Sequence, residues 1–198
     1  MKRIYISSDV QNLAKQYRDN LFTGRGRGFQ YPKRLLDILH EQIRSVKYKK
    51  YVKNIIDHFD EIIVLHPDKF EQYRNQYFSL SVSELNSKRW KKGSKKSFAD
   101  AVIEAMRYDD VRRYEIPNYI KKLNIKSCVY CNAQYTATVH MNNNKILGAY
   151  QIDHFKPKSL YPFLCISFFN LQPCCANCNL WKLDKTIEFN LYTTNPSD

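Results

Sequence analysis

Two cysteine pairs have the spacing of metal-binding knuckles, Cys128-x-x-Cys131 and Cys175-x-x-Cys178. Two residues between the thiols let both sulfurs of a pair face one ion, and two such pairs supply the four thiolates of a closed structural zinc site. All six cysteines lie after residue 127, whereas a disulfide framework is typical of small secreted chains. The pattern therefore predicts a structural Zn²⁺ bound by these four cysteines.

The two remaining cysteines are interpreted differently. Cys174 is an alternative to Cys175, but only Cys175 gives the two-residue spacing to Cys178. Cys165 lies in an apolar run, residues 163–169, and is expected in the core. The segment between the two pairs is longer than in a plain zinc ribbon, so it must contain structure of its own.

Residues suited to phosphodiester hydrolysis lie between and directly after the cysteine pairs. This reaction needs an activated water, a Lewis acid on the phosphate and help for the leaving oxygen. His154 can take a proton from water near neutral pH. Its neighbour Asp153 offers a hard oxygen ligand suited to Mg²⁺, and Asn179 adds a neutral oxygen. These residue types favour a metal-dependent hydrolase.

The order of these features resembles the HNH endonucleases, also called the ββα-metal fold, and especially their zinc-knuckle branch. A cysteine pair is followed by Asp153-His154, then by Asn170-Leu171, and finally by a second cysteine pair with Asn179 directly after it. The resemblance covers residues 128–185, under a third of the chain. Each element alone is common, but their order is specific.

The resemblance implies a role for each of these residues. Asp153 and Asn179 would hold the catalytic Mg²⁺ or Mn²⁺, and His154 would be the general base. Asn170 would fix a loop and orient the histidine, while Lys182, one helical turn after Asn179, would contact phosphate. The third motif position is Asn here rather than His; both occur in the family, and Asn favours Mg²⁺ or Mn²⁺ over softer metals.

The expected fold is α+β, with an α-helical region over residues 1–127 and a ββα-metal HNH module over 128–198 stapled by the zinc site. β-prone runs flank the Asn-rich segment Met141–Asn144, which predicts a hairpin. Apolar spacing predicts helices through Tyr17, from Pro32, over 51–65 and over 97–107. Because the module is small, a structural metal would supply folding energy that its core lacks.

Positive charge is concentrated in the helical region. Residues 1–127 hold 27 Lys or Arg and 15 Asp or Glu, a net charge of +12, out of +13 for the whole chain. A surface of this kind attracts polyanions such as nucleic acid. The densest cluster surrounds Trp90, whose ring is suited to stacking; a solvated hinge is the alternative. Its cations are Lys88, Arg89, Lys91, Lys92, Lys95 and Lys96.

No apolar run is long enough to span a bilayer or to form a signal peptide, so a cytoplasmic protein without a membrane partner is expected. The leading hypothesis is a DNA endonuclease, with RNA as a substrate left open. By analogy it is similar to effectors of bacterial restriction and anti-phage defence that work beside an ATPase or regulatory subunit. The alternatives are a non-catalytic zinc-knuckle nucleic-acid-binding protein, and a helical region that binds an acidic protein partner.

Overall fold

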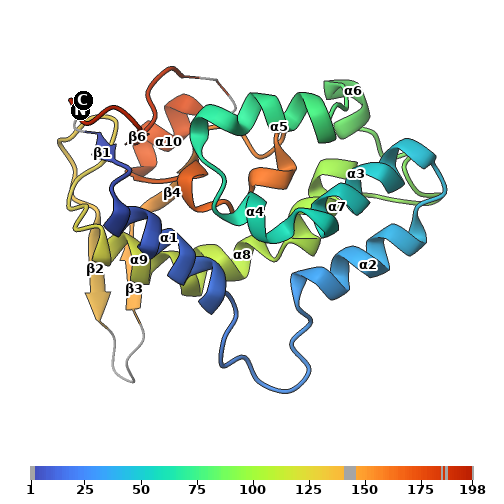
Figure 1. Ribbon diagram of the computed structural model, residues 1–198, viewed down its shortest axis with the longest axis horizontal. Helices are drawn as coiled ribbons and strands as arrows, with labels where there is room; N and C mark the ends of the chain where they lie inside the picture. Colours follow the sequence, from blue (N-terminus) through green and yellow to red (C-terminus); the bar gives the residue numbers. More distant parts are fainter. Residues whose placement is uncertain (1–2, 141–145, 184, 186, 198) are drawn as a thin grey trace.

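Helices dominate the chain before residue 124, and in the described residues after it short strands and one further α-helix follow (Figure 1). The computed structural model describes residues 3–140, 146–183, 185 and 187–197, and within them the fold is α+β. The α-helices are α1 (Ser8–Asn20), α2 (Pro32–Gln42), α3 (Val46–Asp57), α4 (Phe59–Ile63), α5 (Phe70–Tyr77), α6 (Val82–Leu85), α7 (Phe98–Ala105), α8 (Tyr108–Asp110), α9 (Ile116–Lys122) and α10 (Ala176–Lys182).

Local sequence signals explain most helix starts. The Ser7 and Ser97 side chains accept hydrogen bonds from backbone amides in the first turns of α1 and α7, and α2 begins at Pro32. One expectation was wrong. The helix expected over residues 51–65 is two helices, because His58 adopts φ −107° and ψ 18°, which ends α3 and redirects the chain into α4.

Short 3-10 helices cover Pro67–Lys69, Pro162–Leu164 and Phe168–Asn170, and a π-helical turn covers Val111–Glu115. Among the described residues the strands form three pairs. The predicted hairpin is present: β2 (Ala137–His140) pairs antiparallel with β3 (Ile146–Ala149), while its Asn-rich turn lies outside the described residues. β4 (Gln151–His154) pairs antiparallel with β5 (Leu171–Cys174), which leads directly into α10. β1 (Ile4–Tyr5) pairs in parallel with β6 (Tyr192–Thr193), so the two ends of the chain lie side by side (Figure 1).

One hydrophobic core includes side chains from both halves of the chain. The Tyr17 hydroxyl of α1 donates to the Ile166 carbonyl at 2.9 Å, and the Phe78 ring stacks on Phe163 with centroids 4.1 Å apart. The boundary expected at residue 128 therefore does not divide the core. Within the part of the chain that the structure describes, no helix combines the length and the apolar character that crossing a membrane requires.

Candidate active site and metal centre

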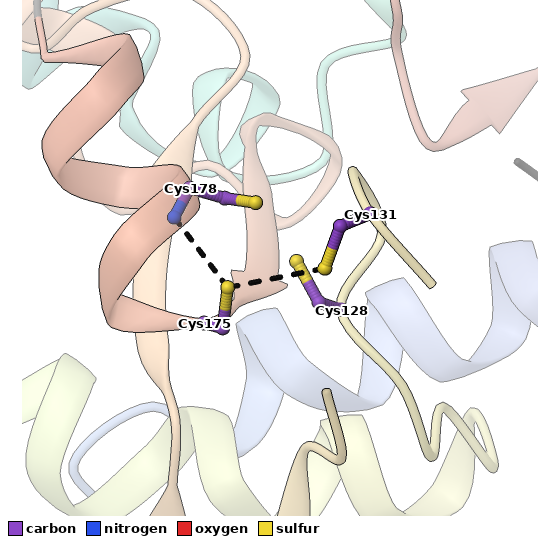
Figure 2. A group of neighbouring side chains, drawn as sticks. All are labelled: Cys128, Cys131, Cys175 and Cys178. Carbon is purple, nitrogen blue, oxygen red and sulfur yellow. Dashed lines mark hydrogen bonds between the residues drawn. The ribbon is translucent and has the colours of Figure 1, made fainter. Parts of the chain in front are cut away.

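Four cysteines from two distant segments meet beside the start of α10. The Sγ atoms of Cys128, Cys131, Cys175 and Cys178 all lie within 4.8 Å of one another, and the Cys131 and Cys175 sulfurs are 4.0 Å apart. Figure 2 shows Cys175 and Cys178 at the base of α10, facing the pair from the loop before β2. The spacing that predicted one shared site is therefore matched by the positions of the sulfurs.

The geometry and donor chemistry of this cluster fit a zinc ion. Zn–S bonds of about 2.3 Å in a tetrahedron separate the sulfurs by roughly 3.8 Å, so small side-chain shifts would close the cluster on one ion. Hydrogen bonds from the backbone amides of Ala133 and Gln134 lower the pKa of Cys131 to about 6, which favours the thiolate that a metal requires. The four cysteines could hold a zinc ion.

The other two cysteines lie outside this group. Cys174 is fully buried next to Cys128 and Cys175, but successive residues of an extended chain point to opposite sides, so it does not share the direction of Cys175. Cys175 instead caps the N-terminus of α10, and its sulfur accepts a hydrogen bond from the Cys178 amide at 3.4 Å. Cys165 is fully buried in the core.

Asp153 lies near the end of β4 and is almost completely buried, with 6% of its surface exposed. The Lys182 ammonium lies 3.1 Å from Asp153 Oδ1 and 3.0 Å from Oδ2. The Tyr130 hydroxyl donates to Oδ2, and burial together with the Asp153 charge raises the pKa of that tyrosine well above its ordinary value. Both carboxylate oxygens are therefore already bound by groups of the protein.

Lys182 does not lie where phosphate contact requires it. Only 1% of this residue is exposed, and its ammonium also donates to the His154 carbonyl at 2.7 Å. The physical reason is the buried Asp153 charge, which needs a cation partner and draws the lysine of α10 inward. In this conformation Lys182 is bound to Asp153 and to the His154 carbonyl, and its contact with substrate phosphate stays a prediction.

The His154 ring faces the core, with 5% of the residue exposed. Its Nε2 lies 2.9 Å from the Cys165 carbonyl oxygen, which can only accept, so Nε2 carries the proton and Nδ1 is the basic nitrogen. The ring also packs on Tyr108, with centroids 4.9 Å apart. Burial lowers the pKa of His154 to about 3, so the imidazole is neutral at pH 7.

Asn170 closes the loop between β4 and β5 at both ends. Its Oδ1 accepts from the Lys156 amide at 2.7 Å, and its Nδ2 donates to the Lys156 and Leu164 carbonyls, each at 3.1 Å. Leu164 precedes Cys165, whose carbonyl binds the imidazole of His154. The asparagine therefore determines the position of the group that orients His154.

Asn179 is less closely integrated with this cluster. It lies on α10 one turn before Lys182 and is half-buried. Among the described residues, no hydrogen bond joins its side chain to Asp153 or to His154. Lys182 thus bonds directly to the Asp153 carboxylate and to the backbone carbonyl of His154, whereas the His154 ring binds the Cys165 carbonyl and Asn179 is near this cluster only by its place on the helix.

The basic segment of residues 88–96 forms the loop between α6 and α7, at the end of the molecule opposite α10 (Figure 1). Its cations are exposed; Lys96 pairs with Glu104 at 2.5 Å, and Lys91 donates to Gln42 at 2.8 Å. Trp90 is buried: its Nε1 donates to the Lys96 carbonyl at 3.1 Å and its ring packs on Phe98. The stacking role expected for Trp90 is therefore wrong. The exposed cations are Lys88, Arg89, Lys91, Lys92, Lys95 and Lys96.

Two hollows flank this loop. One, of about 510 Å³, is lined by aliphatic side chains of α2 and α7 together with Lys91, Lys95 and Lys96. The other, of about 560 Å³, is lined by Arg44, Arg89, Lys91 and Lys92. The loop therefore adds cations to a concave surface that is separate from the Asp153 cluster.

Sequence reasoning missed two groups that complete the Asp153 cluster. The first is Tyr130, which lies between the two cysteines of the first pair. The second is Gln172, which lies opposite Asp153 in the β4–β5 register and donates a hydrogen bond to the Tyr130 hydroxyl at 3.1 Å. The Cys165 carbonyl is a backbone group, so no residue type marks it. The position of Tyr130 between two predicted metal ligands was the one available signal.

Comparisons of the chain with protein-family models, curated proteins and solved structures found no match.

Proposed function

We propose that this protein is a zinc-stapled, metal-dependent endonuclease of the HNH type that hydrolyses phosphodiester bonds of DNA. The observation that carries the proposal is the arrangement of Asp153 and His154 at the end of β4, paired with β5 and followed by α10. The cysteine cluster lies at the start of that helix. A strand pair followed by a helix supports the proposal of a ββα module at this site.

His154 supplies the base in this proposal. Because the Cys165 carbonyl fixes the tautomer, Nδ1 keeps its lone pair, and the ring is neutral at pH 7. A neutral imidazole is the form that accepts a proton from water, but at a pKa of about 3 it is a weak base. Since burial lowers this pKa and also excludes water, the proposal requires the site to open, so that water reaches the ring and its pKa rises toward neutrality.

Asp153 and Asn179 are the residues that would hold a catalytic Mg²⁺ or Mn²⁺. Magnesium sites in nucleic-acid enzymes commonly use one or two carboxylates, with waters and substrate phosphates completing the shell, so this sparse donor set fits. When bound, such an ion polarises the phosphate and stabilises the leaving oxygen. Asp153 must exchange its Lys182 partner to bind it.

The zinc site has a structural role in this scheme. Its ligands come from the loop before β2 and from the first turn of α10, so an ion bound there would fasten the helix to the rest of the module. The basic loop of residues 88–96 would contribute phosphate contacts at a distance, because its cations are exposed beside two hollows.

A second candidate function is favoured by a specific observation. The Asp153 carboxylate is fully occupied by Lys182 and Tyr130, and His154 is buried. A non-catalytic zinc-knuckle nucleic-acid-binding protein could keep this arrangement permanently, since the network stabilises the fold without turnover.

One cleavage experiment separates the two candidates. Plasmid, branched and single-stranded DNA are incubated with the full-length protein and Mg²⁺ or Mn²⁺, in parallel with His154→Gln and His40→Ala. The Gln amide can still donate to the Cys165 carbonyl but cannot act as a base, and His40 lies on α2, away from the site. The enzyme proposal requires cleavage by wild type and His40→Ala and its loss in His154→Gln. Equal cleavage by all three proteins points to a contaminant, and binding without cleavage supports the second candidate.

A further inference from the structure

Helix α10 exposes its large apolar side chains and buries its lysine. Leu180, Trp181 and Leu183 are 66%, 67% and 66% exposed, whereas Lys182 is 1% exposed. A helix at a protein surface normally turns its apolar side inward, because burial of apolar area stabilises the fold. Departures from this pattern are expected at functional sites. The exposed end of α10 is therefore a candidate contact surface.

The two tryptophans of the chain differ sharply in environment. Trp90 is buried, and its indole N–H is bonded to the Lys96 carbonyl. The Trp181 indole makes no hydrogen bond within the described part of the chain, and the Lys185 ammonium lies 5.1 Å from its ring centre. An exposed indole next to a cation is the combination that binds a nucleobase and its phosphate in single-strand binding proteins.

We propose that Trp181 stacks on an unpaired nucleobase of the nucleic-acid strand bound at the Asp153 site. The inference rests on the proposed function for the identity of the ligand as nucleic acid. Trp181 is adjacent to Lys182, which reaches Asp153, so the ring and the candidate site are presented by one helix. Lys185 adds positive charge where the phosphate of a stacked nucleotide would lie.

This contact selects a class of substrate. In an intact duplex both faces of an internal base are already stacked, so a surface tryptophan gains little there. A single strand, or the unpaired part of a branched DNA, offers free base faces of any sequence. The protein is therefore expected to favour DNA with unpaired bases, with little preference for sequence at the stacked position.

A second copy of the chain is the rival occupant of this surface. The apolar patch consists of the three neighbouring side chains at the end of one short helix, less than a stable dimer interface normally requires. The neighbouring Lys185 also favours an anionic ligand over an identical, positively charged chain. Nucleic acid is thus the occupant that the charges support.

The test uses the intrinsic fluorescence of the zinc-replete, full-length protein without added Mg²⁺ or Mn²⁺, which prevents turnover. An oligothymidine and a duplex of equal length are titrated into wild type, Trp181→Ala, Trp181→Phe and Tyr135→Ala, and binding is followed in parallel by anisotropy of labelled DNA. Tyr135, which is 84% exposed, is the control for loss of an exposed aromatic ring outside the α10 surface. We expect the oligothymidine to quench wild-type emission. Trp181→Ala should lose about 5- to 150-fold in single-strand affinity, with duplex affinity unchanged, while Trp181→Phe keeps most of the single-strand affinity and Tyr135→Ala keeps all of it.

Two results would overturn the inference. Unquenched emission on oligothymidine binding, or equal single-strand affinity of wild type and Trp181→Ala, removes the stacking role, while cleavage in the separate plasmid assay would leave the proposed function standing. Absence of both nucleic-acid binding and cleavage removes the proposed function and the inference together. In that case, a dimer in sedimentation that Trp181→Ala converts to a monomer assigns the surface to a second copy.

Discussion

Replacing Lys182 by Met removes the cation partner of the buried Asp153 carboxylate while keeping an apolar stem of similar length. The lysine ammonium makes contacts of 3.1 and 3.0 Å to the two carboxylate oxygens and of 2.7 Å to the His154 carbonyl. In Lys182→Met the carboxylate keeps only the Tyr130 hydroxyl as a described side-chain partner. A buried charge is thus left without its counterion.

The expected cost is large because both partners are almost completely buried. Removing one member of a buried ion pair costs about 3–5 kcal/mol, most of it from the charge that remains. For a chain of 198 residues, each kcal/mol lowers the midpoint of thermal unfolding by about 2–4 °C. We therefore expect Lys182→Met to unfold about 6–20 °C below wild type, by circular dichroism at pH 7.

A double-mutant cycle isolates the ion pair from the general effect of mutation. Lys182→Met combined with Asp153→Asn removes both charges, so the double variant should lose much less stability than the sum of the two single losses. Lys185→Met is the matched control: it removes an exposed lysine near the same helix end and should change the unfolding free energy by less than about 0.5 kcal/mol.

Divalent cations extend the same experiment to the proposed function. Asp153 is no longer paired in Lys182→Met, so Mn²⁺ should raise the unfolding midpoint of this variant more than that of wild type, as any ligand specific to the folded state does. A wild-type midpoint for Lys182→Met, or additive losses in the cycle, would refute the buried pair. A stable pair with no Mn²⁺ effect in any variant would refute Asp153 as a metal ligand.

Three further outcomes are expected. Because burial lowers the pKa of His154 to about 3, the unfolded chain binds one more proton than the folded chain below pH 6.5. The free energy of unfolding should therefore fall by about 1.4 kcal/mol for each pH unit below that value. His154→Gln should lack this contribution when unfolding is measured from pH 7 to pH 5. Zinc analysis should find one ion per chain in wild type and in Cys174→Ala but none in Cys175→Ala, since only Cys175 faces the other thiols. Converting Lys92 and Lys95 to Gln should weaken DNA binding for all sequences and lower the slope of log affinity against log salt by up to about 2, as measured by anisotropy.

The features that could be predicted from the sequence are those set by local spacing. Knuckle spacing identified Cys128, Cys131, Cys175 and Cys178, because two intervening residues place both sulfurs of a pair on one side whatever the remaining fold. The hairpin and most helices follow from apolar periodicity and from caps such as Ser97. These signals act over a few residues, so they survive without knowledge of the tertiary structure.

The features that could not be predicted depend on contacts that local spacing does not specify. Lys182 turns inward because Asp153 lies opposite on β4. Trp90 is buried because its ring packs on Phe98 and its indole N–H donates to the Lys96 carbonyl. Residue type alone suggested the reverse, a lysine at the surface and a tryptophan available for stacking. The exposed Trp181 has the same origin, since α10 is oriented by the cysteine cluster and by Lys182 rather than by its apolar residues.

The Lys182–Asp153 pair constrains how the proposed enzyme would work. A divalent cation that takes Asp153 leaves the buried Lys182 ammonium without its counterion, at a cost of about 3–5 kcal/mol. This cost weakens the apparent affinity of the cation by about two to four orders of magnitude. The displaced ammonium then needs a new anion, and the phosphate of a bound strand is the one that the reaction supplies. Under the proposed function, metal and substrate therefore favour each other's binding, because the metal binds Asp153 and the substrate phosphate binds Lys182. In the non-catalytic alternative the pair never opens, and metal and DNA bind without influence on one another.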